Sequence, residues 1–168
     1  MYDVIVVGAR CAGSPLAMRL AKKGYSGLAV DRATFPSDTI STHFLWPRTT
    51  AMLDAWGLLA RLARTGCPPI ESVTLDFGAV RIRGRPDAVD GTAAMFCPRR
   101  HVLDAMLVDA AREAGAALRE ATTVTDLVWR DDRVVGVETT DRDGHRAVER
   151  TGIVIGADGL WSRVARAV

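Results

Sequence analysis

The feature that most constrains this chain is the order of elements at its N-terminus. An apolar run, Val4–Val7, leads into a turn with the sequence GARCAG at residues 8–13. A helical pattern follows, and a second apolar run, Gly27–Val30, ends at Asp31. This succession of strand, glycine turn, helix, strand and acidic residue predicts a dinucleotide-binding βαβ unit.

Each part of this predicted unit has a physical role. Gly8 allows the chain to turn tightly off the strand, and Gly13 allows the helix to pack closely against the sheet. The helix begins near Ala12, and its N-terminus offers free N–H groups and a partial positive charge to a pyrophosphate. Asp31 can accept hydrogen bonds from both hydroxyls of an adenosine ribose.

Arg10 occupies the position at which such turns usually carry their middle glycine. In one interpretation its side chain points to solvent and the turn tolerates it. In the other, its guanidinium folds over the phosphates as a charge-assisted donor. The neighbouring Cys11 is expected to serve as a small residue near the bound dinucleotide.

Composition excludes several classes of protein. The chain has 168 residues, 48% of them hydrophobic and 25% charged, which is typical of one globular domain with a real core. A net charge of +2 with scattered arginines does not favour nucleic-acid binding. No apolar run reaches membrane-spanning length, and no signal peptide is expected, because the first strand begins at Tyr2. The three cysteines are far apart, so no metal site or disulfide framework is expected, and a cytoplasmic location fits best.

The rest of the chain alternates between helical and extended patterns. Alternating apolar residues on either side of Gly78 favour two antiparallel strands, and Asp143-Gly144 is typical of a further hairpin turn. The apolar run Ile153–Ile155 is flanked by glycines, as is typical of a buried parallel strand. The other expected elements are helical segments at about 48–64, broken near Gly57, a strand at 93–97, a helix at about 100–114, and strands at 117–119, 123–130 and 133–140.

Three motifs in this order resemble a known family. They are the glycine turn with Asp31-Arg32, the sequence RHVLD at 100–104, and the sequence GADG at 156–159 with Ser162 and Arg163 just after it. The set is similar to the flavoprotein monooxygenases of the p-hydroxybenzoate hydroxylase type and to their relatives, the geranylgeranyl reductases and flavin-dependent halogenases. The resemblance implies an α/β fold, a Rossmann-like FAD-binding βαβ unit with a parallel sheet and an antiparallel β insertion.

The resemblance also implies a set of cofactor contacts. Asp31 would hold the adenosine ribose of FAD, with Arg32 beside the adenine. Arg100 would reach the phosphate region, the backbone of Val124 would meet the adenine, and Asp158 would lie near the pyrophosphate. With the residues of the turn, the expected FAD-binding set is Gly8, Arg10, Cys11, Ala12, Gly13, Asp31, Arg32, Arg100, Val124, Asp158 and Gly159.

Some of these residues have a second interpretation. Arg100 could be a solvated residue in the first turn of a helix. The Asp158-Gly159 pair could be an ordinary connection between a strand and a helix. His43 is a candidate acid or base beside the flavin, although a loop histidine is more often a surface residue.

The resemblance divides the chain into residues 1–66 and 99–168, the two parts of the FAD-binding domain, and 67–98, the start of a substrate-domain-like insertion. Family members are longer, and the Gly-Asp motif that they carry after the Asp-Gly motif is absent here. The chain is therefore expected to be an N-terminal fragment, whose exposed apolar surface could lead to self-association.

The expected function is that of an FAD-dependent monooxygenase that takes electrons from NAD(P)H and acts on an organic substrate, aromatic or similar to a polyketide or isoprenoid. Two alternatives are a reductase of carbon–carbon double bonds, similar to geranylgeranyl reductase, and a nucleotide-binding fragment without turnover. A plain NAD-dependent dehydrogenase would explain Asp31 but would leave the other two motifs without a role.

Overall fold

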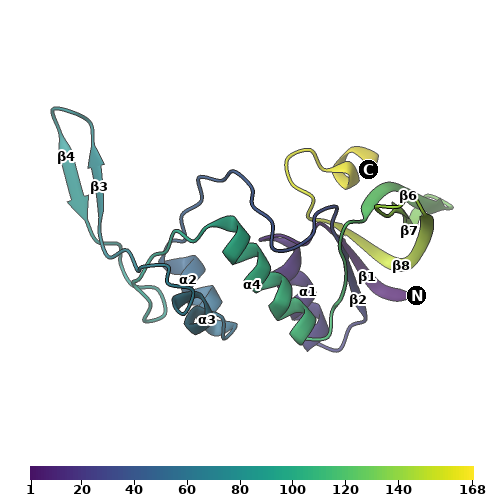
Figure 1. The fold of residues 1–168 in the computed structure, drawn as a ribbon, viewed down its shortest axis with the longest axis horizontal. Helices are drawn as coiled ribbons and strands as arrows, with labels where there is room; N and C mark the ends of the chain where they lie inside the picture. The colour runs from purple at the N-terminus through teal and green to yellow at the C-terminus, as the bar shows by residue number, and fades with distance from the viewer. The chain divides into compact units, whose positions relative to one another are not determined.

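The computed structural model describes residues 1–168, which form two compact units. The first unit comprises Met1–Ser37 and Leu103–Val168, and the second comprises Asp38–Val102. Figure 1 traces the elements of both units in chain order. The sequence-based division assigns residues 1–66 and 99–168 to a cofactor domain and 67–98 to a substrate-domain-like insertion. This assignment stays a prediction.

The first unit is built on a six-stranded sheet with the order β5-β2-β1-β8-β7-β6. The pairs β5–β2, β2–β1 and β1–β8 are parallel, whereas β8–β7 and β7–β6 are antiparallel. The expected α/β fold with a mainly parallel sheet is therefore confirmed. The strands are β1 (Tyr2–Val7), β2 (Gly27–Val30), β5 (Ala117–Arg119), β6 (Thr123–Arg130), β7 (Arg133–Thr140) and β8 (Arg146–Gly156).

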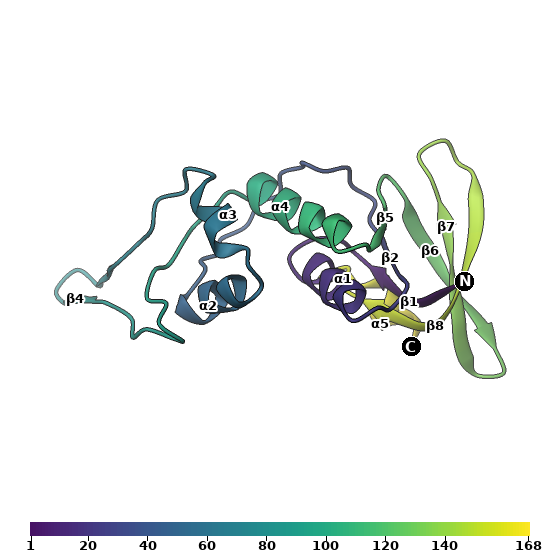
Figure 2. The same cartoon turned by 90° about the horizontal axis from the view of Figure 1, so that it is seen from below.

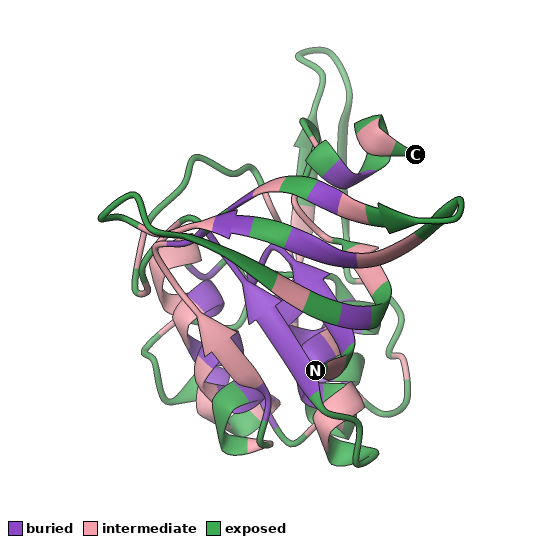
Figure 3. Cartoon of the chain, turned by 90° about the vertical axis from the view of Figure 1, so that its right-hand side faces the viewer, coloured by how far each residue is buried: buried purple, intermediate pink, exposed green.

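Both faces of β1 are covered. Ile5 and Val7 belong to a buried cluster with side chains of β2, β6 and β7. On the opposite face, α1 (Gly13–Lys22) packs on β1 and β2. Coverage on both sides explains why Val4–Val7 is a continuous apolar run rather than an alternating one. Figure 3 shows the buried residues concentrated on these central strands.

The long strand β8 joins the two kinds of pairing. Its first half pairs antiparallel with β7, and from Thr151 onward it pairs parallel with β1. The expected parallel strand at Ile153–Ile155 is thus present, but the expectation that it is buried is wrong at Ile153, which is 59% exposed. Side chains alternate along a strand. Val154 packs on the cluster that contains Val164 of the short helix α5 (Arg163–Ala167), whereas α1 lies over β1 and β2 instead of over Ile153.

The helix α4 (Arg100–Glu113) matches the expected helix at about 100–114. Its residues from Leu103 onward belong to the first unit, where they run beside α1 in both views of Figures 1 and 2. Gly115, with φ +97°, ends the helical segment. The buried residues of α4 include a charged one, Asp104, which is fully buried.

The second unit contains α2 (Pro47–Ala55), α3 (Leu59–Ala63) and a hairpin of β3 (Val73–Asp76) and β4 (Arg81–Gly84). The break that was expected near Gly57 separates α2 from α3. No helix of the chain combines the length and the apolar character that crossing a bilayer requires.

The prediction of a strand at residues 93–97 is wrong. Met95 forms an isolated bridge with Ile70, and Phe96 forms one with Leu45. Because these two neighbours pair with different segments, no continuous ladder develops. In contrast, the expected strands 123–130 and 133–140 pair over their full length as a hairpin, and Asp131 and Asp132 both have the positive φ that a tight turn of this kind needs.

Candidate functional site

Three loops of the first unit meet at the carboxyl edge of the parallel strands. Val7, at the end of β1, is level with Val30 at the end of β2 and with Gly156 at the end of β8. Backbone hydrogen bonds join the loops: the Gly8 N–H donates to Val30 O at 2.8 Å, and the Ala157 N–H donates to Val7 O at 2.7 Å. The loops that carry Gly8, Asp31 and Asp158 therefore lie together at the edge where open α/β sheets bind their ligands.

Two glycines make this close approach possible. Gly8 has φ +98°, and a Cβ on it would lie 2.4 Å from the carbonyl oxygen of Ala157. A Cβ on Gly13 would lie 1.7 Å from the carbonyl oxygen of Gly8. Neither distance is compatible with a side chain. The positive φ of Gly8 confirms the tight turn expected there, and the close approach at Gly13 confirms its expected packing role.

The N-terminus of α1 is left open by the chain itself. Its N-cap residue, Ala12, makes no side-chain hydrogen bond, and the first turn contains no acidic residue. The backbone N–H groups of Arg10, Ala12 and Gly13 have no acceptor within the chain, whereas Ser14 uses both its N–H and its hydroxyl on the carbonyls of the turn. Unsatisfied N–H groups at the positive end of a helix form a ready site for an anion.

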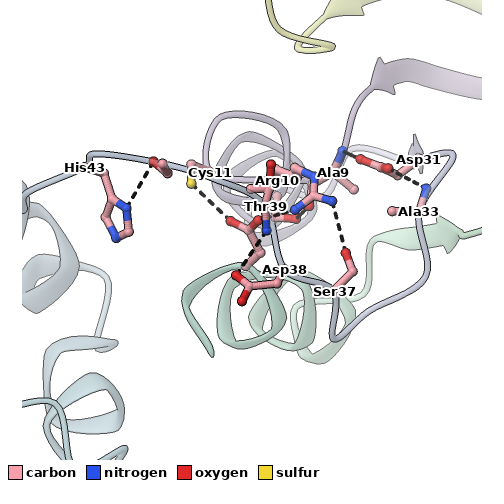
Figure 4. Close-up of polar contacts among 12 residues, drawn as sticks. Ala9, Arg10, Cys11, Asp31, Ala33, Ser37, Asp38, Thr39 and His43 are labelled. Carbon is pink, nitrogen blue, oxygen red and sulfur yellow. Dashed lines mark hydrogen bonds and ion pairs between the residues drawn. The ribbon is translucent and has the colours of Figure 1, made fainter. Parts of the chain in front are cut away.

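Asp31 is fixed beside this helix start. It is only 8% exposed, and its Oδ2 accepts the Ala9 N–H at 2.8 Å while its Oδ1 accepts the Ala33 N–H at 2.8 Å. Figure 4 shows both bonds. Each carboxylate oxygen keeps a further lone pair, so this oriented carboxylate can still accept hydrogen bonds from a diol. The neighbouring Arg32 is exposed.

The side chain of Arg10 is held within the first unit, so the interpretation that it simply points to solvent is wrong. Its Nη1 donates to Oδ2 of the buried Asp104 at 2.7 Å, and its Nη2 donates to Ser37 Oγ at 3.0 Å. Its guanidinium also lies over the ring of Phe35, 5.4 Å from the centroid. The thiol of Cys11 donates to the second oxygen of Asp104, with an S–O distance of 3.1 Å. Figure 4 shows how the Arg10 and Cys11 side chains lie.

Asp158 is occupied within its own loop. Its Oδ1 accepts the Ser162 hydroxyl at 2.6 Å and its Oδ2 accepts the Arg163 N–H at 2.6 Å, while Ser162 Oγ accepts the Ala165 N–H at 3.0 Å. Partial burial raises the pKa of Asp158, but the hydrogen bonds from Ser162 and Arg163 outweigh it, so the pKa lies below its usual range. These contacts are those of a strand-to-helix connection, and a contact between Asp158 and a cofactor stays a prediction.

The remaining predicted residues lie elsewhere. Val124 is a buried residue of β6 and part of the core cluster. Arg100 is the first residue of α4 and belongs to the second unit. In the same unit, His43 Nδ1 lies 3.1 Å from Ser41 Oγ, and His43 Nε2 is buried without a hydrogen-bond partner. The roles proposed for these residues from the sequence stay predictions.

One further group of metal-type ligands lies in the β7–β8 turn. Ligand atoms of Asp141, Asp143 and His145 come within 4.8 Å of one another. The backbone N–H of His145 is the main cause that lowers the pKa of Asp141, and Asp141 also accepts the N–H of Asp143. These bonds stabilise the turn, and nothing about this exposed cluster points to a bound ion.

Asp104, which accepts hydrogen bonds from Arg10 and Cys11 of the glycine turn, lies in the RHVLD motif, but sequence analysis assigned it no role. A usable signal was present, because Asp104 follows Leu103 on the apolar side of the expected helix. A carboxylate in that position is almost never fully buried unless it is paired, and Arg10, a charged residue in a turn usually built of small ones, was the partner to consider.

The complete chain, residues 1–168, matches the family described as an FAD binding domain. Similar proteins include digeranylgeranylglycerophospholipid reductase 2 of Methanothermobacter thermautotrophicus, which is 32% identical over 167 residues that make up 98% of this chain and 41% of that protein. Protein FixC of Salmonella typhi is 30% identical over 169 residues, 98% of this chain and 38% of that protein. The chain thus spans about 40% of the length of the curated relatives that it matches.

Solved structures of flavin enzymes share the fold. The myxobacterial chondrochloren halogenase CndH, an FAD-dependent halogenase, superimposes with a TM-score of 0.91 at 27% identity, over 99% of this chain and 39% of CndH. The flavin-dependent monooxygenase PieE, solved in complex with FAD and substrate, gives a TM-score of 0.81 at 25% identity, over 99% of this chain and 31% of PieE.

Proposed function

Because the chain belongs to the FAD binding domain family, we propose that it binds FAD at the carboxyl edge of β1, β2 and β8, and that it acts in an NAD(P)H-dependent monooxygenase of an organic substrate. The observation that carries the cofactor assignment is the open N-terminus of α1 beside the oriented carboxylate of Asp31. One feature suits a pyrophosphate and the other a ribose, and the two adjoin each other through Ala9.

The residues of the site fit two parts of FAD, the pyrophosphate and the adenosine ribose. The N–H groups of Ala12 and Gly13 would donate to the pyrophosphate, and the helix dipole would favour its charge. Asp31 would accept the ribose hydroxyls, with Arg32 beside the adenine. Arg100, Val124, Asp158 and Gly159 remain proposed further contacts. When bound, FAD would supply the redox chemistry, while the protein supplies binding, orientation and electrostatics.

Monooxygenase chemistry is supported by the likeness to PieE, which was solved with FAD and substrate. The proposed substrate class is aromatic or similar to a polyketide or isoprenoid. A second candidate is reduction of a carbon–carbon double bond, which is favoured by the 32% identity with a digeranylgeranylglycerophospholipid reductase. A third candidate is nucleotide binding without turnover, because the chain spans only about 40% of such relatives.

Cofactor binding can be tested separately from catalysis. Purified chain titrated with FAD should quench flavin fluorescence to a saturating level, and free AMP should compete because it shares the ribose contact. Absence of saturable FAD binding would overturn the cofactor assignment. NADPH oxidation coupled to oxygen uptake would favour the monooxygenase, NADPH oxidation that needs an isoprenoid acceptor and no oxygen would favour the reductase, and binding without oxidation would favour the third candidate.

Two further sequence predictions stay proposals. Self-association is supported by the exposed apolar side chains of the β3–β4 hairpin, where Leu75, Phe77, Val80 and Ile82 are each more than half exposed. Sedimentation of the chain at several concentrations would test it. A cytoplasmic location is a proposal that rests on composition alone.

A further inference from the structure

One guanidinium connects three segments of the first unit. Arg10 lies in the turn after β1, and its contacts reach Phe35 and Ser37 in the segment after β2, and Asp104 on α4. The next residue of the turn, Cys11, donates to the same Asp104 carboxylate. Two consecutive residues of the open turn are thereby attached to one buried group on another element.

The charge of Arg10 is compensated by this arrangement. Its Nη1 lies 2.7 Å from Oδ2 of Asp104, and the side chains are 28% and 0% exposed, respectively. The 2.7 Å contact is a charge-assisted hydrogen bond in a place with little access to water, so separating Arg10 from Asp104 would lose a strong interaction. Moving the guanidinium onto a phosphate would sacrifice this bond, even though its position in the turn is close to the proposed anion site.

We propose that Arg10 and Asp104 form a positioning pair, which holds the glycine turn in the conformation that exposes its N–H groups to a dinucleotide. In this arrangement Asp104 controls FAD affinity although it lies outside the turn, and Arg10 contributes through geometry instead of through a contact with phosphate. The inference about affinity rests on the proposed function, while the inference about the turn holds for the free chain.

Two substitutions separate positioning from direct phosphate binding. Arg10→Lys keeps the positive charge but loses the planar fork and the stacking on Phe35. Asp104→Asn keeps the shape of the side chain but removes the charge that holds Arg10. Positioning predicts that each weakens FAD binding by about tenfold, the cost of one charge-assisted hydrogen bond. Direct phosphate binding predicts little change for Arg10→Lys and equal or tighter binding for Asp104→Asn, because the guanidinium would be released.

The salt dependence of FAD affinity separates a positioning role from direct contact with the phosphate. If Arg10 touched the phosphate, Arg10→Met would reduce the dependence of FAD affinity on ionic strength, because one screened charge pair would be lost. A positioning role leaves that dependence unchanged while the affinity falls. Arg81→Lys is the matched control, because Arg81 is paired with Asp76 in the hairpin of the second unit and should leave FAD affinity unaltered.

Amide hydrogen exchange tests the pair without any cofactor. In the free chain, Arg10→Lys and Asp104→Asn should speed exchange of the hydrogen-bonded amides of the turn, those of Gly8, Ala9 and Ser14, by about tenfold, as expected for the loss of one restraining interaction, while exchange in β6 and β7 stays unchanged. If Asp104→Asn does not fold, Ser37→Ala, which removes only the bond at 3.0 Å, should still give a two- to threefold effect of the same pattern.

The outcomes distinguish the two ideas. Faster exchange in the turn with no FAD binding by the unsubstituted chain would support the pair and overturn the proposed function. Unaltered exchange in the turn, or FAD affinity that survives Arg10→Lys and rises in Asp104→Asn, would overturn the positioning pair.

Discussion

The loops after β1 and β8 are built on the same plan but end differently. Each follows a parallel strand at one edge of the sheet, contains a glycine with positive φ, and starts a helix. In the β8–α5 loop, Asp158 and Ser162 accept the N–H groups at the start of the helix. In the β1–α1 loop, no side chain does so.

The difference shows how one scaffold makes either a connection or a binding site. Helix starts need acceptors for their N–H groups. The β8–α5 loop supplies acceptors from its own sequence and is self-sufficient, whereas the β1–α1 loop leaves its N–H groups for an external anion. Asp31, which contacts the β1–α1 loop, instead accepts N–H groups outside the helix, from Ala9 and Ala33.

The largest effect is expected at Gly13, where the open loop depends on close packing. Gly13→Ala would put a methyl group 1.7 Å from the Gly8 carbonyl oxygen, a backbone atom that cannot move alone. We expect a loss of about 3 kcal/mol in the free energy of unfolding, measured by urea denaturation, together with loss of FAD binding.

Gly159→Ala is the matched change in the β8–α5 loop, which is closed in the sense that its own side chains accept the N–H groups at the start of α5. Gly159 has φ +83°, but a Cβ there would meet no atom within 4 Å. Only backbone strain is expected, about 1 kcal/mol. If Gly13→Ala and Gly159→Ala lowered the free energy of unfolding equally, the two loops would not differ in how closely they are packed.

The next effect in size concerns the two carboxylates. Asp31→Ala should weaken FAD binding by about 1–3 kcal/mol, the usual cost of leaving buried hydrogen-bond partners unsatisfied. Asp158→Ala should chiefly lower the thermal stability of the chain. Titration of both variants with FAD checks this, and an equal loss of affinity in Asp158→Ala would show that both loops hold the cofactor.

The positions of secondary structure could be predicted from the sequence where local chemistry determines them. The strands 117–119, 123–130 and 133–140 have the predicted bounds because turn residues such as Gly115 and Asp131-Asp132 separate them. The error at residues 93–97 arose because strand pairing depends on partners distant in sequence, here Ile70 and Leu45. Exposure of Ile153 likewise depends on which helix covers which face, which alternation cannot show.

The site could be predicted only in part, for a similar reason. The glycine turn and Asp31 are local signals of a βαβ unit, and their packing follows from the motif. The partner of Arg10 could not be read from spacing, because Asp104 is 94 positions away. Nor could the motif at 156–159 reveal that Asp158 is already occupied by Ser162 and Arg163, since both helix capping and cofactor contact need the same carboxylate.

A smaller effect is expected from closing the open loop. Ala12→Asp would place a carboxylate at the N-cap of α1, as Ser162 places its hydroxyl at that of α5. Pro15 has no N–H and the Ser14 N–H already donates to Arg10 O, so the carboxylate would act on the free chain through the helix dipole, which adds about 0.3–1 kcal/mol of stability. FAD binding should weaken by about tenfold, because the new carboxylate lies at the helix start and repels the pyrophosphate. Ala12→Asn, which has a similar shape without the charge, should weaken binding less, and tighter binding in Ala12→Asp would show that the helix start is not the anion site.

The smallest effect is expected from removing the Ser162 hydroxyl from the β8–α5 loop. This effect on stability should depend on pH. Ser162→Ala removes the hydroxyl that donates to Asp158, one of the contacts that lower the pKa of that carboxyl. A carboxyl whose pKa is lowered by folding stabilises the folded chain above its unfolded pKa, and this stabilisation disappears as the pH falls through the lower folded value. Asp158 is partly exposed, so the charge-dependent part of the loss should be only about 0.5 kcal/mol at pH 7.

As the pH falls below the reference value of 3.8 and through the lower pKa of Asp158 in the folded chain, the difference between Ser162→Ala and the unsubstituted chain should narrow. It should not vanish, because Ser162 also caps α5 through the Ala165 N–H, a contact that carries no charge. Urea denaturation at pH 7 and pH 3 measures both parts, with Ser162→Thr as the control that keeps the hydroxyl. A difference that is the same at both pH values would mean that the Asp158 carboxylate does not hold this loop closed, and the contrast with the open turn would then rest on Ser162 alone.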